Sequence, residues 1–218
     1  MKQRILAITQ AVLIALVVLS GAIALPLLFR PFFYWHIGPL RLPELVELTA
    51  PEIKTAYNEV MNYCIGLTDT FSAGSLPFSD AGAEHFADVQ KLFVLDLRAL
   101  VASAILLIGI RLAFRKEKLR LLDHTPGFWG AVGLGFGISA VGALAALDFN
   151  KAFMVFHKLF FPGKDNWIFN YHTDEIIRAL PQEFFANCAL LIGGSIIVLS
   201  LGCIIFGIVE CRKHNRNT

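Results

Sequence analysis

Four long runs of apolar residues divide the chain, and polar residues gather between them. The runs cover residues 5–29, 94–114, 127–147 and 184–209. In a helix that rises 1.5 Å per residue, about 20 apolar residues cross the roughly 30 Å hydrocarbon core of a bilayer. Three runs hold no charged residue, and the run at 94–114 carries its charges near its ends. The pattern therefore predicts an all-α integral membrane protein with four transmembrane helices.

Basic residues concentrate in the three short segments that four spans would place on one side of the membrane. These segments hold ten Lys or Arg and three Asp or Glu, the basic ones being Lys2, Arg4, Arg111, Arg115, Lys116, Lys118, Arg120, Arg212, Lys213 and Arg216. The positive-inside rule then predicts cytoplasmic termini. Two extracytoplasmic loops, about 30–93 and 148–183, are expected to form a cap over the bundle. We expect a single membrane domain, 1–218, in the cell membrane.

Composition supports a lipid environment. Hydrophobic residues make up 56% of the 218 and charged residues 17%, against about 45–50% and about 25% in soluble domains. A soluble enzyme is therefore disfavoured. Nineteen Lys and Arg nearly balance seventeen Asp and Glu, so no basic surface is expected for nucleic acid. The four cysteines lack zinc-site spacing and are expected to be buried as small apolar side chains.

The first loop contains an amphipathic pattern between Thr49 and Gly66. Apolar residues recur at helical spacing, at Ile53, Tyr57, Val60, Met61, Cys64 and Ile65. Thr49 is a suitable N-cap and Pro51 fits the first turn, so a helix is predicted here. Residues 66–78 are rich in Gly, Ser and Thr and predict a loop or a short hairpin.

The sharpest feature of the first loop is a histidine beside two carboxylates. Ser79 or Asp80 is expected to cap a helix that continues into the second span. On this helix Glu84 and Asp88 share a face, and His85 precedes Asp88 by three positions. Carboxylates in these positions could orient the His85 ring. The alternative is an interfacial histidine with one hydrogen bond.

The second loop places another histidine among aromatic residues. His157 is surrounded in the sequence by Phe153, Phe156, Phe160 and Phe161. Apolar surroundings lower the pKa of an imidazole because desolvation disfavours its charged form, which suits a base near neutral pH. The four phenylalanines are candidates for an acyl-chain pocket, although packing alone would also explain them.

Common catalytic motifs are missing from the sequence. It contains no GxSxG elbow, HExxH helix, P-loop or dinucleotide fingerprint. A serine hydrolase and a zinc peptidase with a helix-borne ligand pair are therefore disfavoured. His85 and His157 could still converge with Asp88 or Glu84 on a metal ion, so a metal-dependent membrane hydrolase or acyltransferase stays an alternative.

Several segments of this sequence resemble the bacterial lipoprotein intramolecular transacylase family, four-span membrane proteins known mainly from low-GC Gram-positive bacteria. They are IKTAYNEVMNY at 53–63, LPFSDAGAEHFADVQKLF at 76–93, FHKLFF at 156–161 and DNWIF at 165–169. The likeness continues from Asp174 to Phe185, and it covers nearly the whole chain.

The resemblance implies a reaction. The sn-2 acyl chain of a diacylglyceryl-modified N-terminal cysteine moves to the α-amino group of that cysteine and gives a lyso-form lipoprotein. The functional histidines of the family fall on His85 and His157. The expected partners are a diacylglyceryl-modified lipoprotein and membrane lipid, and no cofactor or metal is expected.

Acid/base catalysis without a covalent acyl-enzyme fits these residues, because the substrate amine is itself the nucleophile. We expect His85, oriented by Glu84 or Asp88, to act as base. His157 would polarise the ester or protonate the leaving oxygen, and the two roles are exchangeable. The expected supporting residues are Asn166 and Trp167, as hydrogen-bond donors, and Asp174. The alternative outside enzymology is a membrane protein whose loops bind a lipid or a partner protein.

Overall fold

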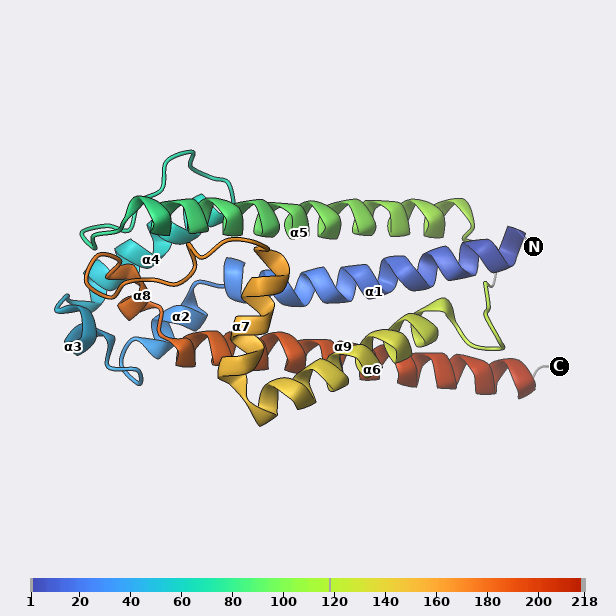
Figure 1. Cartoon of the computed structure of the whole chain (residues 1–218). Coiled ribbons are helices and arrows are strands. Elements are labelled where there is room, and N and C mark those ends of the chain that lie inside the picture. Colours follow the sequence, from blue (N-terminus) through green and yellow to red (C-terminus); the bar gives the residue numbers. More distant parts are fainter. Residues whose placement is uncertain (1, 118, 217–218) are drawn as a thin grey trace. The chain divides into compact units, whose positions relative to one another are not determined.

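The computed structural model describes residues 2–117 and 119–216, which form nine helices and no β-strand (Figure 1). Four are long and apolar enough to cross a membrane: α1 (Lys2–Leu28), α5 (Asp80–Ala113), α6 (Pro126–Leu147) and α9 (Gln182–Arg216). The others are α2 (Pro31–His36), α3 (Leu42–Val46), α4 (Ala50–Cys64), α7 (Phe149–Phe160) and α8 (Ile176–Ala179). The predicted all-α protein with four spans is confirmed.

Helix α5 is longer than the predicted second span. Its 34 residues measure about 51 Å at 1.5 Å per residue, against a hydrocarbon core of about 30 Å. The helix thus begins well before residue 94, as expected from the predicted cap at Ser79 or Asp80. Residues 80–93 form the first turns of the same helix outside the apolar run, and these turns carry His85.

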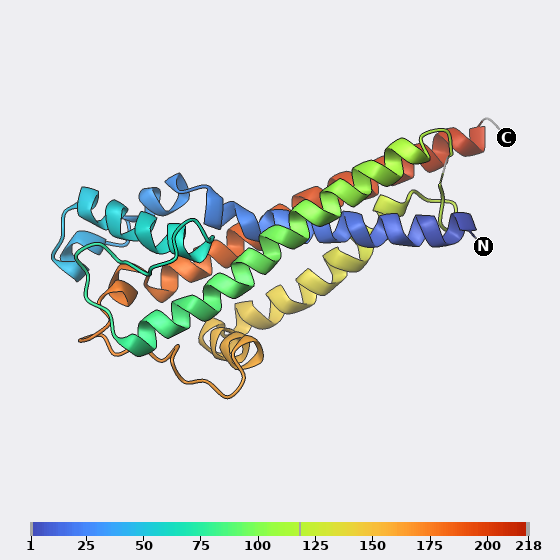
Figure 2. The same ribbon diagram turned by 90° about the horizontal axis from the view of Figure 1, so that it is seen from above.

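By their contacts, the residues group into two compact units. Unit 1 comprises Met1–Ile23, Asp96–Leu144 and Leu191–Thr218, and unit 2 comprises Ala24–Leu95 and Ala145–Leu190. In unit 1, the first turns of α1, the α5–α6 connection and the last turns of α9 lie at one end (Figures 1 and 2). This is the arrangement expected of four spans. The cytoplasmic location of that end stays a prediction, and Lys118, one of its basic residues, lies outside the described residues.

Unit 1 packs through small residues and exposes apolar ones. A Cβ at Gly130 of α6 would collide with the Ala11 carbonyl of α1, so glycine permits this close approach of two helices. Large apolar side chains such as Leu112, Phe136 and Phe206 remain exposed on the outside of the spans. An apolar exterior of this kind requires a lipid solvent.

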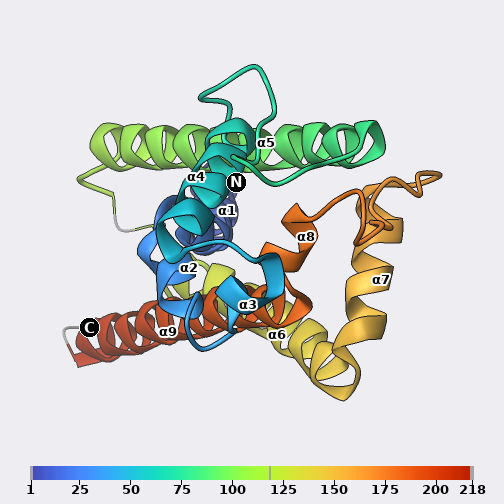
Figure 3. The ribbon, with the colours of Figure 1, turned by 90° about the vertical axis from the view of Figure 1, so that its left-hand side faces the viewer.

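Unit 2 has its own apolar core around α4. The predicted stripe is confirmed at Ile53, Tyr57, Val60, Met61 and Cys64, which are all buried, while Ile65 is half-buried and follows the last residue of α4. Thr49 is the N-cap of α4, and its N–H and hydroxyl both donate to the Glu52 carboxylate, at 2.8 and 2.6 Å. Helix α3 packs against α4 and α8 (Figure 3). Residues 66–78 form a loop, so the hairpin alternative is wrong.

One buried carboxylate ties the start of α5 to the segment that follows α7. Asp174 Oδ1 accepts hydrogen bonds from the backbone N–H and the hydroxyl of Ser79, at 2.8 and 2.7 Å. The Ser79 hydroxyl in turn accepts from the Gly82 N–H at 3.0 Å, which makes Ser79 the N-cap of α5. Burial raises the pKa of Asp174, but these hydrogen bonds, with one from the Thr173 hydroxyl, outweigh burial and lower it.

Replacing Gly82 by Ala is expected to destabilise the protein, because a Cβ at this position would collide with Asp174 Oδ1. Overpacking of this kind costs about 1–3 kcal/mol. The thermal unfolding midpoint in detergent should fall. Gly109 lies in the same helix and has open space around it. The control variant G109A should therefore keep or raise the midpoint, and equal midpoints for G82A and wild type would contradict the prediction.

Candidate active site

His85 lies on the first turns of α5 and is almost fully buried in unit 2, with 5% of its surface exposed. The Phe161 and Phe169 rings approach its ring edge-on, with centroid distances of 4.9 and 5.4 Å. Within the described part of the chain, His85 Nδ1 has no hydrogen-bond partner. The imidazole is therefore fixed by aromatic packing, and its unpaired Nδ1 is shielded from solvent.

His157 lies on α7, which only Asp148 separates from α6. Asp148 caps this helix by accepting a hydrogen bond from the Lys151 N–H at 3.0 Å. The His157 ring is 7% exposed and lies 4.2 Å from Phe153 and 4.8 Å from Trp167, measured between centroids. His157 Nδ1 is 2.8 Å from the Phe153 carbonyl oxygen. Because a carbonyl only accepts, Nδ1 donates and the neutral ring keeps a bare Nε2.

The structure brings His85 and His157 together, although 72 positions separate them in the sequence. Their ring centroids are 5.7 Å apart, with 33° between the ring planes. Burial and, to a smaller extent, the nearby His157 together lower the pKa of His85 to about 4, while Asp88 opposes the shift. Burial also lowers the pKa of His157. Both rings are therefore neutral at physiological pH, the state in which imidazole accepts a proton.

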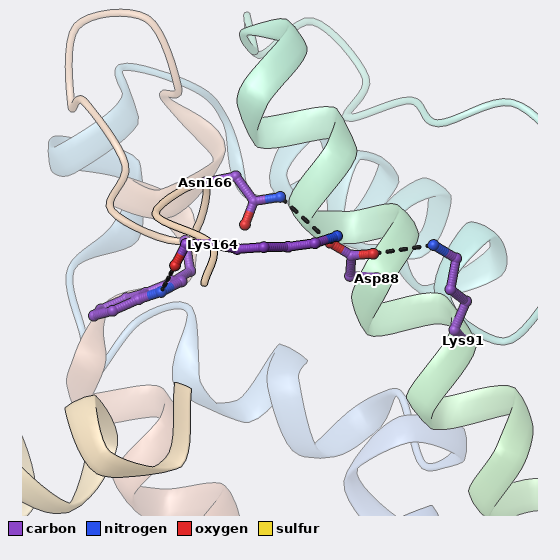
Figure 4. Close-up of polar contacts among 5 residues, drawn as sticks. Asp88, Lys91, Lys164 and Asn166 are labelled. Carbon is purple, nitrogen blue, oxygen red and sulfur yellow. Dashed lines mark hydrogen bonds and ion pairs between the residues drawn. The ribbon is translucent and has the colours of Figure 1, made fainter. Parts of the chain in front are cut away.

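Asp88 is the centre of a charged network one turn after His85 (Figure 4). Its carboxylate accepts from Lys91 Nζ at 3.0 Å, from Lys164 Nζ, and from Asn166 Nδ2 at 3.4 Å. Burial raises the pKa of Asp88, but these hydrogen bonds outweigh burial and lower it to about 2. Asp88 is therefore a permanent anion that holds the loop after α7 against α5.

The predicted orientation of His85 by Glu84 or Asp88 needs correction. Glu84 is exposed, since adjacent residues on a helix point in directions about 100° apart. Asp88 is close enough to affect His85 electrostatically, but its hydrogen-bond donors are Lys91, Lys164 and Asn166. Neither carboxylate is hydrogen-bonded to His85 Nδ1.

The two residues expected to donate hydrogen bonds already use their N–H groups. Trp167 Nε1 donates to the Lys164 carbonyl at 2.9 Å, and Asn166 Nδ2 donates to Asp88. Both residues still belong to the site. The Trp167 ring packs on His157, and the hydrogen bond from Asn166 connects its loop to Asp88 on α5. The atom of Asn166 that lacks a partner within the described chain is its oxygen, Oδ1.

The four phenylalanines around His157 divide into two pairs. Phe161 is buried and Phe153 is half-buried, and both contact the histidine ring. Phe156 and Phe160 are each 47% exposed and pack against each other with a centroid distance of 4.6 Å. The last two therefore form part of the exposed apolar face of α7, and the acyl-chain pocket stays a prediction.

The described residues contain no group of three or more His, Cys, Asp or Glu side chains placed to hold a metal ion. Glu84 is exposed and Asp88 is engaged by lysines, so neither completes a ligand set with the histidine pair. The site therefore consists of two neutral imidazoles, aromatic walls and one orphaned amide oxygen.

Comparisons with known proteins agree with this geometry. The family model of the lipoprotein intramolecular transacylase Lit matches residues 8–185. The chain belongs to the lipoprotein intramolecular transacylase family. The in meso structure of Lit from Bacillus cereus aligns with a TM-score of 0.88 and 26% identity, over 100% of this chain and 99% of that one. Membership of the transacylase family makes the protein a membrane-integral acyltransferase.

Two further structures of Bacillus cereus Lit align over almost their full length. The structure with an H85R mutation has a TM-score of 0.82 and 25% identity, over 100% of this chain and 95% of that one. The structure with an H85A mutation has the same TM-score and identity, over 99% of this chain and 96% of that one. Among curated proteins, none matches this sequence.

Some contacts within this transacylase site had no signal in the sequence. Lys164 pairs with Asp88 across 76 positions, and Ser79 pairs with Asp174 across 95 positions. Each residue type is common in loops and at helix ends, so only the folded contact distinguishes them. Phe169, which packs on His85, lies within a segment that carried the family resemblance.

Replacing Lys164 by Met is expected to loosen the loop after α7, because it removes one of the side chains that bind Asp88. A partly exposed ion pair contributes at most about 1 kcal/mol, so amide hydrogen exchange at Trp167 and Ile168 should accelerate by about fivefold. The control is K91M, which removes a lysine from the same carboxylate but from within α5. Equal exchange rates in K164M and K91M would show that the ion pair does not hold the loop.

Proposed function

We propose that the protein moves the sn-2 acyl chain of a diacylglyceryl-modified N-terminal cysteine to the α-amino group of the same cysteine. The product is a lyso-form lipoprotein. The observation that carries this proposal is the facing pair of buried, neutral histidines in a member of the transacylase family. Two proton acceptors at one site suit a reaction in which an ammonium group must lose a proton to become the nucleophile and a second proton after attack.

The proton balance of the reaction requires two transfers. An N–C bond forms, the ester C–O bond breaks, and two protons leave the nitrogen. One of them ends on the glycerol oxygen and the other is released to solvent. His85 takes the first proton from the ammonium. His157, whose Nε2 is bare, takes the second from the tetrahedral intermediate and returns it to the glycerol oxygen.

The substrate supplies the remaining chemistry. An α-amine with an ordinary pKa near 7.7–8.0 attacks an ester a few bonds away, so no covalent acyl-enzyme is needed. Cys64 is unsuited to be a nucleophile, because burial raises the pKa of its thiol to about 12. The protein's part is to orient the ester, remove protons and keep water away.

The acyl chains enter from the membrane. On α7 the exposed apolar face contains Val155, Phe156, Leu159 and Phe160, and Phe153 and Phe161 lie next to His157. A chain lying along this face reaches the histidine without leaving an apolar environment. The excess of basic residues near the termini favours an extracytoplasmic position for unit 2, on the side where the diacylglyceryl group of a lipoprotein is anchored.

Replacing His85 or His157 by Ala should slow the transfer strongly. General acid/base groups contribute typically 10²–10⁴-fold each to the rate of a reaction, so the transfer rate of each variant should fall by a factor in that range. The measurement is mass spectrometry of a lipoprotein N-terminal peptide from a host that lacks N-acylation. Fragmentation locates the acyl chain on glycerol or on nitrogen.

The matched control is His172→Ala, which removes an exposed histidine of the same loop and should leave the product unchanged. Glycerol that keeps both chains despite expression of the wild-type protein in the membrane would favour a lipid- or protein-binding role. Loss of activity with a chelator, restored by metal, would favour a metal-dependent acyltransferase.

The pH dependence of kcat/KM distinguishes removal of a proton by the histidines from spontaneous attack by free amine. The pKa of His85 is lowered to about 4, so the ring is already neutral well below pH 6. Between about pH 5.5 and 7.5 the base form of His85 and the ammonium form of the substrate both predominate. The profile should therefore be flat in this range and fall only near pH 4.

The contrasting result has a clear signature. If only substrate that is already deprotonated reacts, kcat/KM rises tenfold per pH unit up to about pH 7.7. His85→Gln should convert the flat profile into this rising one, because the variant lacks the first proton acceptor. A rising profile for the wild-type protein would remove His85 from the role of base.

A further inference from the structure

Asn166 carries a buried hydrogen-bond acceptor that no described residue satisfies. Its Oδ1 is shielded from solvent and has no hydrogen-bond partner within the described chain. An unpaired buried polar atom costs about 1–3 kcal/mol, so such atoms in folded proteins call for an explanation. The other end of the same side chain is satisfied, because Nδ2 donates to Asp88.

The charged network determines which way the Asn166 amide faces. A carboxylate only accepts hydrogen bonds, so the NH₂ group must face Asp88 and the oxygen must face away. Asp88 is itself held by Lys91 and Lys164, whose side chains only donate hydrogen bonds. Figure 4 shows Asn166 Nδ2 directed at Asp88 and Oδ1 turned from it. The orphaned oxygen is therefore held in one direction before any ligand arrives.

This oxygen belongs to the neighbourhood of the histidine pair. Asn166 precedes Trp167, whose ring lies 4.8 Å from that of His157. Its partner Asp88 follows His85 by one turn of α5, and His85 Nδ1 is the other orphaned polar atom of the site. Two atoms without partners thus come from the two segments that form the site.

The substrate of the proposed reaction offers few groups that could satisfy an acceptor. Ester carbonyls, ester oxygens and the thioether of a diacylglyceryl cysteine only accept hydrogen bonds. The N–H donors of the modified residue and its peptide are the α-amino group and the backbone amides. The α-amino group carries a positive charge at neutral pH and forms the stronger, charge-assisted bond.

We propose that Asn166 Oδ1 accepts a hydrogen bond from the α-amino group of the lipoprotein cysteine, which makes Asn166 a substrate-binding residue. This inference rests on the proposed function. It makes the Asn166 oxygen a hydrogen-bond acceptor, whereas the sequence predicted that the residue would act as a hydrogen-bond donor. The bond holds the nucleophile in place while the histidines take its protons. It also favours lipoproteins with a free amine over N-acylated ones, whose amide nitrogen has one donor and no charge.

The test uses two ligands that cannot react. One is a dialkyl ether analogue of the diacylglyceryl lipopeptide with a free α-amine, and the other is the same analogue with hydrogen in place of the amine. Dissociation constants are measured in detergent micelles at pH 6.5, where the amine is charged. Wild-type protein should bind the amine analogue about 10- to 100-fold more tightly, which is the range for a hydrogen bond to a charged group.

Two variants separate the acceptor from the link to Asp88. Asn166→Leu removes both the oxygen acceptor and the hydrogen bond to Asp88, so its dissociation constants for the two analogues should agree within about twofold. Asn166→Asp also breaks the hydrogen bond to Asp88 but keeps an oxygen acceptor, so it should still prefer the amine. Unchanged affinity of both variants for the deamino analogue reports intact folding. Asn150→Leu, an exposed change on α7, should behave as wild type.

Two results would overturn the inference. In the first, wild-type protein binds both analogues equally. In the second, N166D loses the preference for the amine as completely as N166L, which would show that the tie to Asp88 is what matters. Turnover of the ester substrate by wild-type protein is measured separately. Its absence would count against the proposed function, while the binding comparison still decides the role of Asn166.

Discussion

The site depends on one buried carboxylate at the N-terminus of α5. Asp174 accepts two hydrogen bonds from Ser79, and the positive end of the helix dipole favours its negative charge. These interactions offset the cost of burying an ion. Ser79 begins the helix that carries His85, and Asp174 ends the loop that follows the helix of His157. This contact therefore joins the two segments that hold the histidines, and a glycine at position 82 leaves room for it.

The same burial that packs unit 2 prepares its histidines for catalysis. A solvated imidazole would be partly protonated near neutral pH, and a protonated ring is no base. Aromatic side chains around His85 and His157 exclude water, which disfavours the charged forms and lowers both pKa values. The phenylalanines that the sequence offered as an acyl-chain pocket thus include two, Phe153 and Phe161, that contact the histidine rings.

Local apolar patterns predicted the four spans and α4 but not α2, α3, α7 or α8, and the structure supplied the long-range contacts. The four spans and the buried stripe of α4 follow from local patterns of apolar residues, and Thr49 was recognisable as a cap. The contacts Lys164–Asp88 and Ser79–Asp174 join residues 76 and 95 positions apart, and no local pattern encodes such pairs. The expected orientation of His85 by a carboxylate failed because residues adjacent on a helix diverge and because lysines already occupy Asp88.

The division of labour between carboxylates and imidazoles follows from their hydrogen bonds. Asp88 and Asp174 each receive several donors, and this keeps their pKa values low and both groups ionised. An anion so engaged neither donates a proton nor readily accepts one near neutral pH. The two histidines have the opposite environment, with apolar walls and a ring nitrogen without a partner at His85. Structural anchoring therefore falls to the carboxylates, and proton transfer is left to the histidine pair.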